Sequence, residues 1–84
     1  MIRIKSAQAL DGFRVRLEFT DGSQGEVDLT KYLWGPVFEP LLRDRRMFES
    51  LRVDPEMGTI VWDNGADMDP DVLYELAHRA AVRE

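Results

Sequence analysis

The sequence has no cysteine and only one histidine among its 84 residues. Disulfide bonds, thiolate metal centres, cysteine nucleophiles and multi-histidine metal sites are therefore excluded. Long apolar runs are also missing, since no stretch approaches the roughly 20 apolar residues that a membrane span needs. Residues 1–5 alternate apolar and basic side chains, which is not the pattern of a signal peptide. We therefore expect a soluble cytoplasmic protein that does not contact a membrane.

Length and apolar content bound the architecture. Hydrophobic residues make up 44% of the chain and charged residues 32%, so the chain is too apolar to be disordered. We expect a single domain over residues 1–84, since domains typically span about 50–250 residues. A catalytic barrel, which needs roughly 250 residues, is excluded.

Basic residues are absent from one long segment. Residues 54–75 hold seven carboxylates and no lysine or arginine, whereas the whole chain carries a net charge of −5. Residues 1–53 hold nine basic and eight acidic side chains and are nearly neutral. The acidity of the protein is therefore local, and we call residues 54–75 the acidic segment.

The first half of the sequence predicts three antiparallel strands over residues 2–9, 13–19 and 24–29. Apolar and charged side chains alternate in 13–19 and again in 26–29, which is typical of half-buried strands. A three-residue loop with Gly22 in the left-handed conformation would set Val15 opposite Val27 and Arg16 opposite Glu26. For the preceding hairpin, the alternation of apolar and charged side chains favours a two-residue turn at 11–12 that pairs Leu10 with Phe13.

The second half predicts short helices, a second hairpin and a final helix. Pro40 suits the first turn of one short helix, and Asp44 can cap another that runs through residue 48. Turn residues at 55–58 separate two short strands and pair Val53 with Ile60. Asp69 is a suitable N-cap for a helix whose apolar stripe is formed by Leu73, Leu76, Ala77 and Ala80. The expected fold is α+β, in the order β-β-β-(short α)-β-β-α, with helices on one face of the antiparallel sheet.

Several segments of the chain are similar to one small bacterial family. These are 19–22, 27–29, Leu41, Leu42, Asp44, Phe48, 60–68, Pro70 and 73–74, of which 60–68 (Ile-Val-Trp-Asp-Asn-Gly-Ala-Asp-Met) is the most specific. The chain resembles the family known as Domain of Unknown Function 2442. The resemblance implies a compact α+β domain that stands alone or precedes a helix-turn-helix domain. It also implies a neighbouring gene for another small protein, as in toxin–antitoxin pairs, and no established catalytic residue.

The acidic segment has three possible roles, which are turn and cap chemistry, cation binding and partner contact. Asp67, Asp69 and Asp71 have the alternate spacing of a calcium-binding loop. Such a loop needs a glycine at position 72 and a glutamate at position 78, but the sequence has Val72 and His78 there, so the pattern fails. We expect turns and caps first and partner contact second, with no metal or cofactor.

Arginines supply a candidate site of opposite charge. Arg43, Arg45, Arg46 and Arg52 form the only basic cluster, which would contact phosphate or an acidic partner, or lie on a solvated helix face. No aromatic residue is interleaved with them, and the net negative charge works against nucleic acid. Direct nucleic-acid binding is therefore the alternative and not the first expectation.

Aromatic side chains surround the Gly35-Pro36 pair. Tyr32, Trp34 and Phe38 either pack beneath a loop or form an exposed patch that binds a partner or a second copy of the chain.

Together these patterns predict a non-catalytic, regulatory and antitoxin-like interaction module. No serine elbow, phosphate loop or perturbed carboxylate pair is evident, so an enzyme is the least favoured class. The expected partner is a small basic protein encoded by a neighbouring gene, and a homodimer is also possible. The candidate partner-binding residues are Trp34, Arg43, Arg45, Arg46, Trp62, Asp63, Asn64 and Asp67.

Overall fold

The computed structural model describes residues 2–82, and the side chains of residues 2–79. Its elements are β1 (Ile4–Ala9), β2 (Arg14–Phe19), β3 (Gln24–Asp28), a 3-10 turn η1 (Thr30–Tyr32), α1 (Glu39–Arg43), α2 (Arg45–Glu49), β4 (Arg52–Asp54), β5 (Thr59–Val61) and α3 (Pro70–Val82). The strands form an antiparallel β1-β2-β3 sheet and a separate β4-β5 hairpin. The predicted α+β class and the order of its elements are confirmed.

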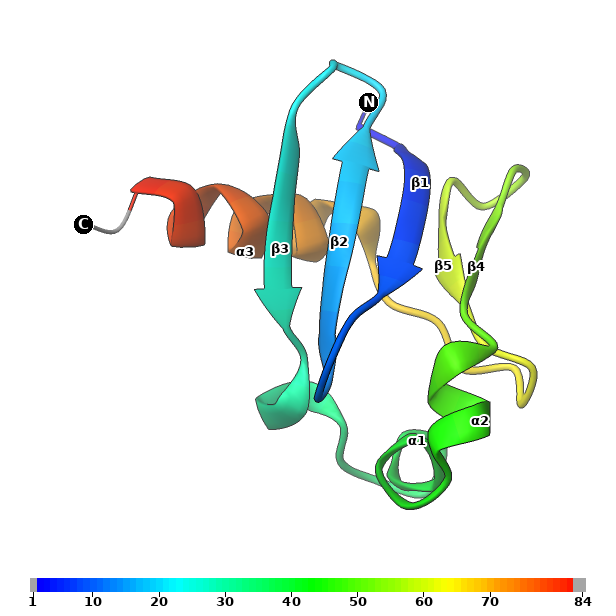
Figure 1. Cartoon of the computed structure of the whole chain (residues 1–84). Helices are drawn as coiled ribbons and strands as arrows, with labels where there is room; N and C mark the ends of the chain where they lie inside the picture. Colours follow the sequence, from blue (N-terminus) through cyan, green and yellow to red (C-terminus); the bar gives the residue numbers. More distant parts are fainter. Residues whose placement is uncertain (1, 83–84) are drawn as a thin grey trace.

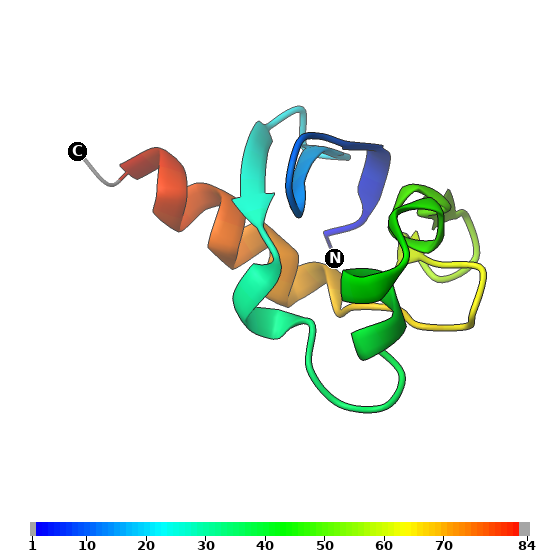
Figure 2. The same cartoon turned by 60° about the horizontal axis from the view of Figure 1, so that its bottom comes forward.

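Helix α3 lies across one face of the three-stranded sheet, and the β4-β5 hairpin lies beside β1 (Figure 1). Helices α1 and α2 lie beyond the end of the sheet. The chain between η1 and α1 forms a wide loop that reaches from α3 toward α1 (Figure 2). This loop becomes one wall of the candidate site.

The core forms where the sheet meets α3. Leu17 and Val27 from the sheet are buried together with Leu73 and Ala77 of α3. Gly25 permits β3 and α3 to approach each other closely, because a Cβ at this position would lie only 2.9 Å from the Cβ of Ala77. The apolar face predicted for the last helix is therefore confirmed at its buried positions, whereas the side chain of Ala80 lies outside the described part.

The predicted register between β2 and β3 is confirmed. Val15 lies opposite Val27 and Arg16 opposite Glu26. Gly22 closes the three-residue loop with a φ of +90°, a value that disfavours side chains other than glycine. On the outer face the guanidinium groups of Arg14 and Arg16 both pair with Glu26, at 2.8 and 3.0 Å.

The turn predicted for the first hairpin is wrong. The amide of Leu10 donates a hydrogen bond to the carbonyl of Arg14 at 2.8 Å, so Phe13 belongs to a three-residue turn and does not pair with Leu10. Gly12 has a φ of +65°, which is the left-handed residue of such a turn.

A bulge in β1 explains the mistaken turn. Ile4 lies opposite Phe19, as expected, but the register shifts by one residue before Ser6. The extra residue is Lys5, and Lys5 and Ser6 are both exposed. The bulge keeps Ile4 and Ala7 on the inner face although they are an odd number of residues apart. Strict alternation along the strand therefore predicted the wrong turn length.

Side-chain caps begin the helices where the sequence predicts them. The Asp44 carboxylate accepts hydrogen bonds from the backbone amides of Arg46 and Met47, at 3.0 and 3.4 Å. Asp69 accepts from the amide of Asp71 at 2.8 Å, and α3 begins at the next residue, Pro70. The cap at Asp69 also fixes where α3 meets the candidate site.

Candidate protein-binding site

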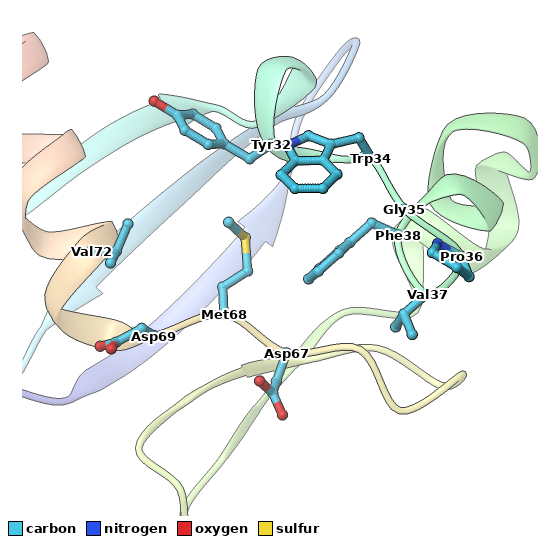
Figure 3. A pocket seen from close by; sticks show the side chains of 10 residues that line it. All are labelled: Tyr32, Trp34, Gly35, Pro36, Val37, Phe38, Asp67, Met68, Asp69 and Val72. Atoms are coloured by element: carbon cyan, nitrogen blue, oxygen red, sulfur yellow. The ribbon is translucent and has the colours of Figure 1, made fainter.

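An apolar pocket of about 500 Å³ opens between the wide loop and the start of α3 (Figure 3). One wall is residues 32–38, and the other is residues 67–72. The lining residues are Tyr32, Trp34, Gly35, Pro36, Val37, Phe38, Asp67, Met68, Asp69 and Val72. The volume falls within the roughly 300–1,000 Å³ range of protein ligand sites.

Trp34 is the main exposed apolar group of this pocket. Its side chain is 74% exposed, and Val37 and Val72 nearby are also exposed. Tyr32 and Phe38 are only half-buried and pack against the core. Figure 3 shows the three aromatic rings and the Met68 side chain around one opening. Of the aromatic residues considered, Trp34 is therefore exposed, whereas Tyr32 and Phe38 pack beneath the loop.

Asn64 connects the loop wall to the segment that precedes residues 67–72. Its Nδ2 donates to the carbonyl of Val37 at 2.9 Å, and its Oδ1 accepts from the amide of Ala66 at 3.1 Å. Gly35 turns the loop with a φ of +92°. Asn64, a predicted contact residue, thus has a structural role in shaping the pocket.

Carboxylates lie at the edge of the pocket. Asp67 and Asp69 line its α3 side, and Asp71 is exposed in the first turn of that helix. Asp69 is occupied by its cap, whereas Asp67 forms no ion pair with any described residue. The pocket therefore combines an apolar interior with a negative rim.

Other acids of the acidic segment have structural partners. Asp54 accepts hydrogen bonds from the amides of the 56–57 turn at 2.8 and 3.2 Å. Asp63 pairs with Arg52 at 2.8 Å, and Glu75 pairs with Arg79 at 2.6 Å. The carboxylates of this segment without an ion pair or cap among the described residues are thus Asp67 at the pocket, Asp71 in the first turn of α3 and Glu56 in the turn of the β4-β5 hairpin.

Trp62 was predicted to contact a partner, but the structure buries it. It is 1% exposed, and its Nε1 donates to the carbonyl of Phe48 at 3.0 Å. Phe38 packs edge-on against it, with ring centroids 6.3 Å apart. Trp62 therefore anchors the core beneath the pocket and is not available to a partner.

Arg45 also has a structural role. Its guanidinium donates to the carbonyls of Leu10 and Gly12 in the β1-β2 turn and to the carboxylate of Glu49. The same group lies 5.0 Å from the centre of the Phe48 ring. Arg45 thus joins α2 to the sheet, an arrangement that the sequence pattern did not indicate.

The remaining arginines do not form a bare basic patch. Arg43 lies 3.7 Å from Glu39, and Arg52 is paired with Asp63. Arg46 is exposed and makes no ion pair with the residues that the structure describes. The cluster identified in the sequence therefore offers one uncompensated cation, which is weak support for a phosphate-binding surface.

A polar cluster that sequence reasoning missed joins α3 to the β2-β3 turn. The Tyr74 hydroxyl donates to Asp21 at 2.6 Å, and the Ser23 hydroxyl donates to the same carboxylate at 2.6 Å. The hydrogen bonds from Ser23 and Tyr74 lower the pKa of Asp21 to about 2, and the bond to Asp21 raises the pKa of Tyr74. His78 stacks on Tyr74 with ring centroids 3.8 Å apart. The local Asp-Gly-Ser pattern indicates the turn, but nothing in it indicates the distant tyrosine.

Two kinds of feature are absent from the described residues. No cluster of three or more histidine, aspartate or glutamate side chains is arranged to hold a metal ion. Within the same part of the chain, no helix has the length and apolar character to cross a bilayer.

Comparison with known proteins shows which family the chain belongs to. The crystal structure of a "putative DNA binding protein" from Nitrosomonas europaea is similar, with a TM-score of 0.82 and 25% sequence identity. The similarity covers 98% of this chain and 52% of that protein, so this chain spans about half its length. No curated protein matches the chain. Residues 4–79 match the family described as "Protein of unknown function (DUF2442)", and the chain belongs to that family.

Proposed function

We propose that this protein is a non-catalytic regulatory module, antitoxin-like in its role, that binds a small basic protein. The observation that carries the proposal is the exposed Trp34 side chain in an apolar pocket with a negative rim. Tryptophan is enriched among the side chains that dominate binding energy at interfaces. A monomer gains nothing from leaving so large an apolar group in water.

Charge supports a basic partner over an acidic one. The acidic segment carries seven carboxylates without a base, and its uncompensated member Asp67 lines the pocket, while Asp71 is exposed in the first turn of α3. Such a surface attracts a positively charged protein over distances of about 8–10 Å at physiological salt and disfavours a negative one. The same field disfavours a symmetric homodimer through this face, because it would bring identical carboxylates together.

Coexpression with the products of the neighbouring genes tests the proposal. We expect one small basic protein to copurify at micromolar concentrations, in a complex that weakens as salt rises. A gel-filtration run of the isolated protein serves as the control for self-association. The absence of any complex with the neighbouring products would remove the proposed function.

A role as an accessory to DNA binding is the second candidate. It is favoured by the similar protein from Nitrosomonas europaea, whose description names DNA binding and of which this chain covers about half. The candidate contact is the arginine cluster, within which Arg46 alone is not paired among the described residues. A mobility shift with random duplex at low ionic strength that is lost in Arg46→Ala would support it. No shift would leave the protein-binding proposal as the sole candidate.

A further inference from the structure

We propose that the pocket holds one apolar side chain of the partner, and that a lysine or arginine next to it in the partner's sequence reaches the negative rim. This inference rests on the proposed function and names the chemistry that the partner would present. The occupant is therefore a short segment with an apolar anchor and a flanking positive charge.

The interior of the pocket sets the requirement for an apolar anchor. Its deeper walls are the half-buried Tyr32, Phe38 and Met68 side chains, and the exposed Trp34 ring extends the surface outward. These groups offer contact area and a polarisable sulfur but few hydrogen-bonding atoms. A polar or charged group placed at the bottom would lose its water without gaining a partner.

The rim sets the requirement for the flanking charge. Asp67 lines the pocket and forms no ion pair with any described residue, and Asp71, two residues beyond the Asp69 cap, is exposed in the first turn of α3. A cation beside the anchor on the α3 side meets a carboxylate there. A segment flanked by glutamate would meet repulsion at the same place.

The loop wall is held in a binding-competent position before any partner arrives. The hydrogen bond from Asn64 to the Val37 carbonyl joins the loop wall to the segment that leads into the other wall. A preformed wall lowers the ordering cost of binding. Asn64 is thus a positioning residue, which explains why it belongs to the site although its amide is already engaged.

Selection from a phage-displayed library of random dodecapeptides on the full chain tests the inference. We expect the enriched peptides to carry one large apolar residue next to lysine or arginine. We expect Trp34→Ala to weaken their binding about thirtyfold, as for a dominant interface residue. Asp67→Asn should weaken it about threefold at low salt and less at high salt.

Two matched variants control for nonspecific effects. Met57→Ala removes another exposed apolar side chain, and Glu56→Gln removes another carboxylate of the acidic segment, both in the turn of the β4-β5 hairpin. Both should bind the selected peptides as the unaltered protein does. Asn64→Ala removes the donor to Val37 without adding a charge, and it should weaken binding about threefold to tenfold, since that hydrogen bond preforms the wall.

Every other result of the selection contradicts the inference. Peptides without basic residues, binding that is unchanged in Trp34→Ala, or the absence of enriched peptides would each overturn it. Binding of a second copy or of random duplex, lost in Trp34→Ala, would assign the pocket to that occupant instead. Copurification of a basic neighbouring protein despite such a result would leave the proposed function intact and place its contact elsewhere.

Discussion

Replacing Gly25 by alanine tests how closely α3 packs on the sheet. The new Cβ would lie 2.9 Å from the Cβ and 3.2 Å from the backbone oxygen of Ala77. The φ angle of Gly25 is not positive, so alanine introduces no backbone strain of its own. The perturbation is therefore a steric contact between β3 and α3, and α3 must shift to relieve it.

The expected loss of stability follows from two opposing effects. Forcing an extra methyl group into a packed interior costs about 1–3 kcal/mol. Replacing glycine with alanine also restricts the unfolded chain, which stabilises the fold by about 0.4–1 kcal/mol. The midpoints leave a net loss of about 1.3 kcal/mol, which lowers the melting temperature of a domain of this size by about 5–10 °C.

Thermal unfolding followed by circular dichroism measures this loss, and a double-mutant cycle assigns it to the contact. Ala77→Gly removes the opposing methyl group and alone destabilises the helix by about 1 kcal/mol. In the double variant the two changes should compensate by at least about 0.5 kcal/mol. A Gly25→Ala variant as stable as the unaltered protein, or strictly additive effects in the cycle, would refute the proposed packing.

Three further predictions concern side-chain hydrogen bonds that stabilise the fold. Trp62→Phe removes the indole donor to the Phe48 carbonyl, which keeps only the longer bond from the Leu51 amide at 3.4 Å, and it leaves a cavity in the core. The free energy of unfolding should therefore fall by about 2 kcal/mol in urea titrations; an unchanged value would contradict the buried position of Trp62. Asp44→Ala removes an N-cap and should cost about 1 kcal/mol in the same assay, whereas no loss would show that the cap is not formed. Because the pKa of Asp21 is lowered from 3.8 to about 2, its hydrogen bonds stabilise the fold above the ordinary pKa and lose that effect as the pH falls toward 2. The stability difference between Tyr74→Phe and the unaltered protein should therefore be full near about pH 5 and shrink on acidification, and a difference independent of pH would contradict the link.

Local patterns predicted the parts of the fold that neighbouring residues determine. The Asp69-Pro70 pair marks the start of α3, and the parity of apolar residues around Gly22 sets the register of β2 and β3. The bulge at Lys5 escaped prediction because it depends on which residues of β1 face the core, a property of packing and not of the local pattern.

The candidate site was only partly predictable for the same reason. Trp34 and Trp62 both precede turns, yet one is exposed and the other is buried, because only Trp62 continues a strand into the core. The contact of Arg45 with Leu10 and the contact of Tyr74 with Asp21 join residues 35 and 53 positions apart. Periodicity and capping rules describe neighbours in sequence and carry no information about such pairs.

The most direct measurement of the central claim is the affinity of Trp34→Ala for a basic, apolar-anchored peptide from the selection, compared with that of Met57→Ala. Fluorescence anisotropy titrations with the labelled peptide give both dissociation constants. If the pocket is the protein-binding site, binding weakens about thirtyfold in Trp34→Ala and is unchanged in Met57→Ala. Equal affinities for the two variants would contradict the account.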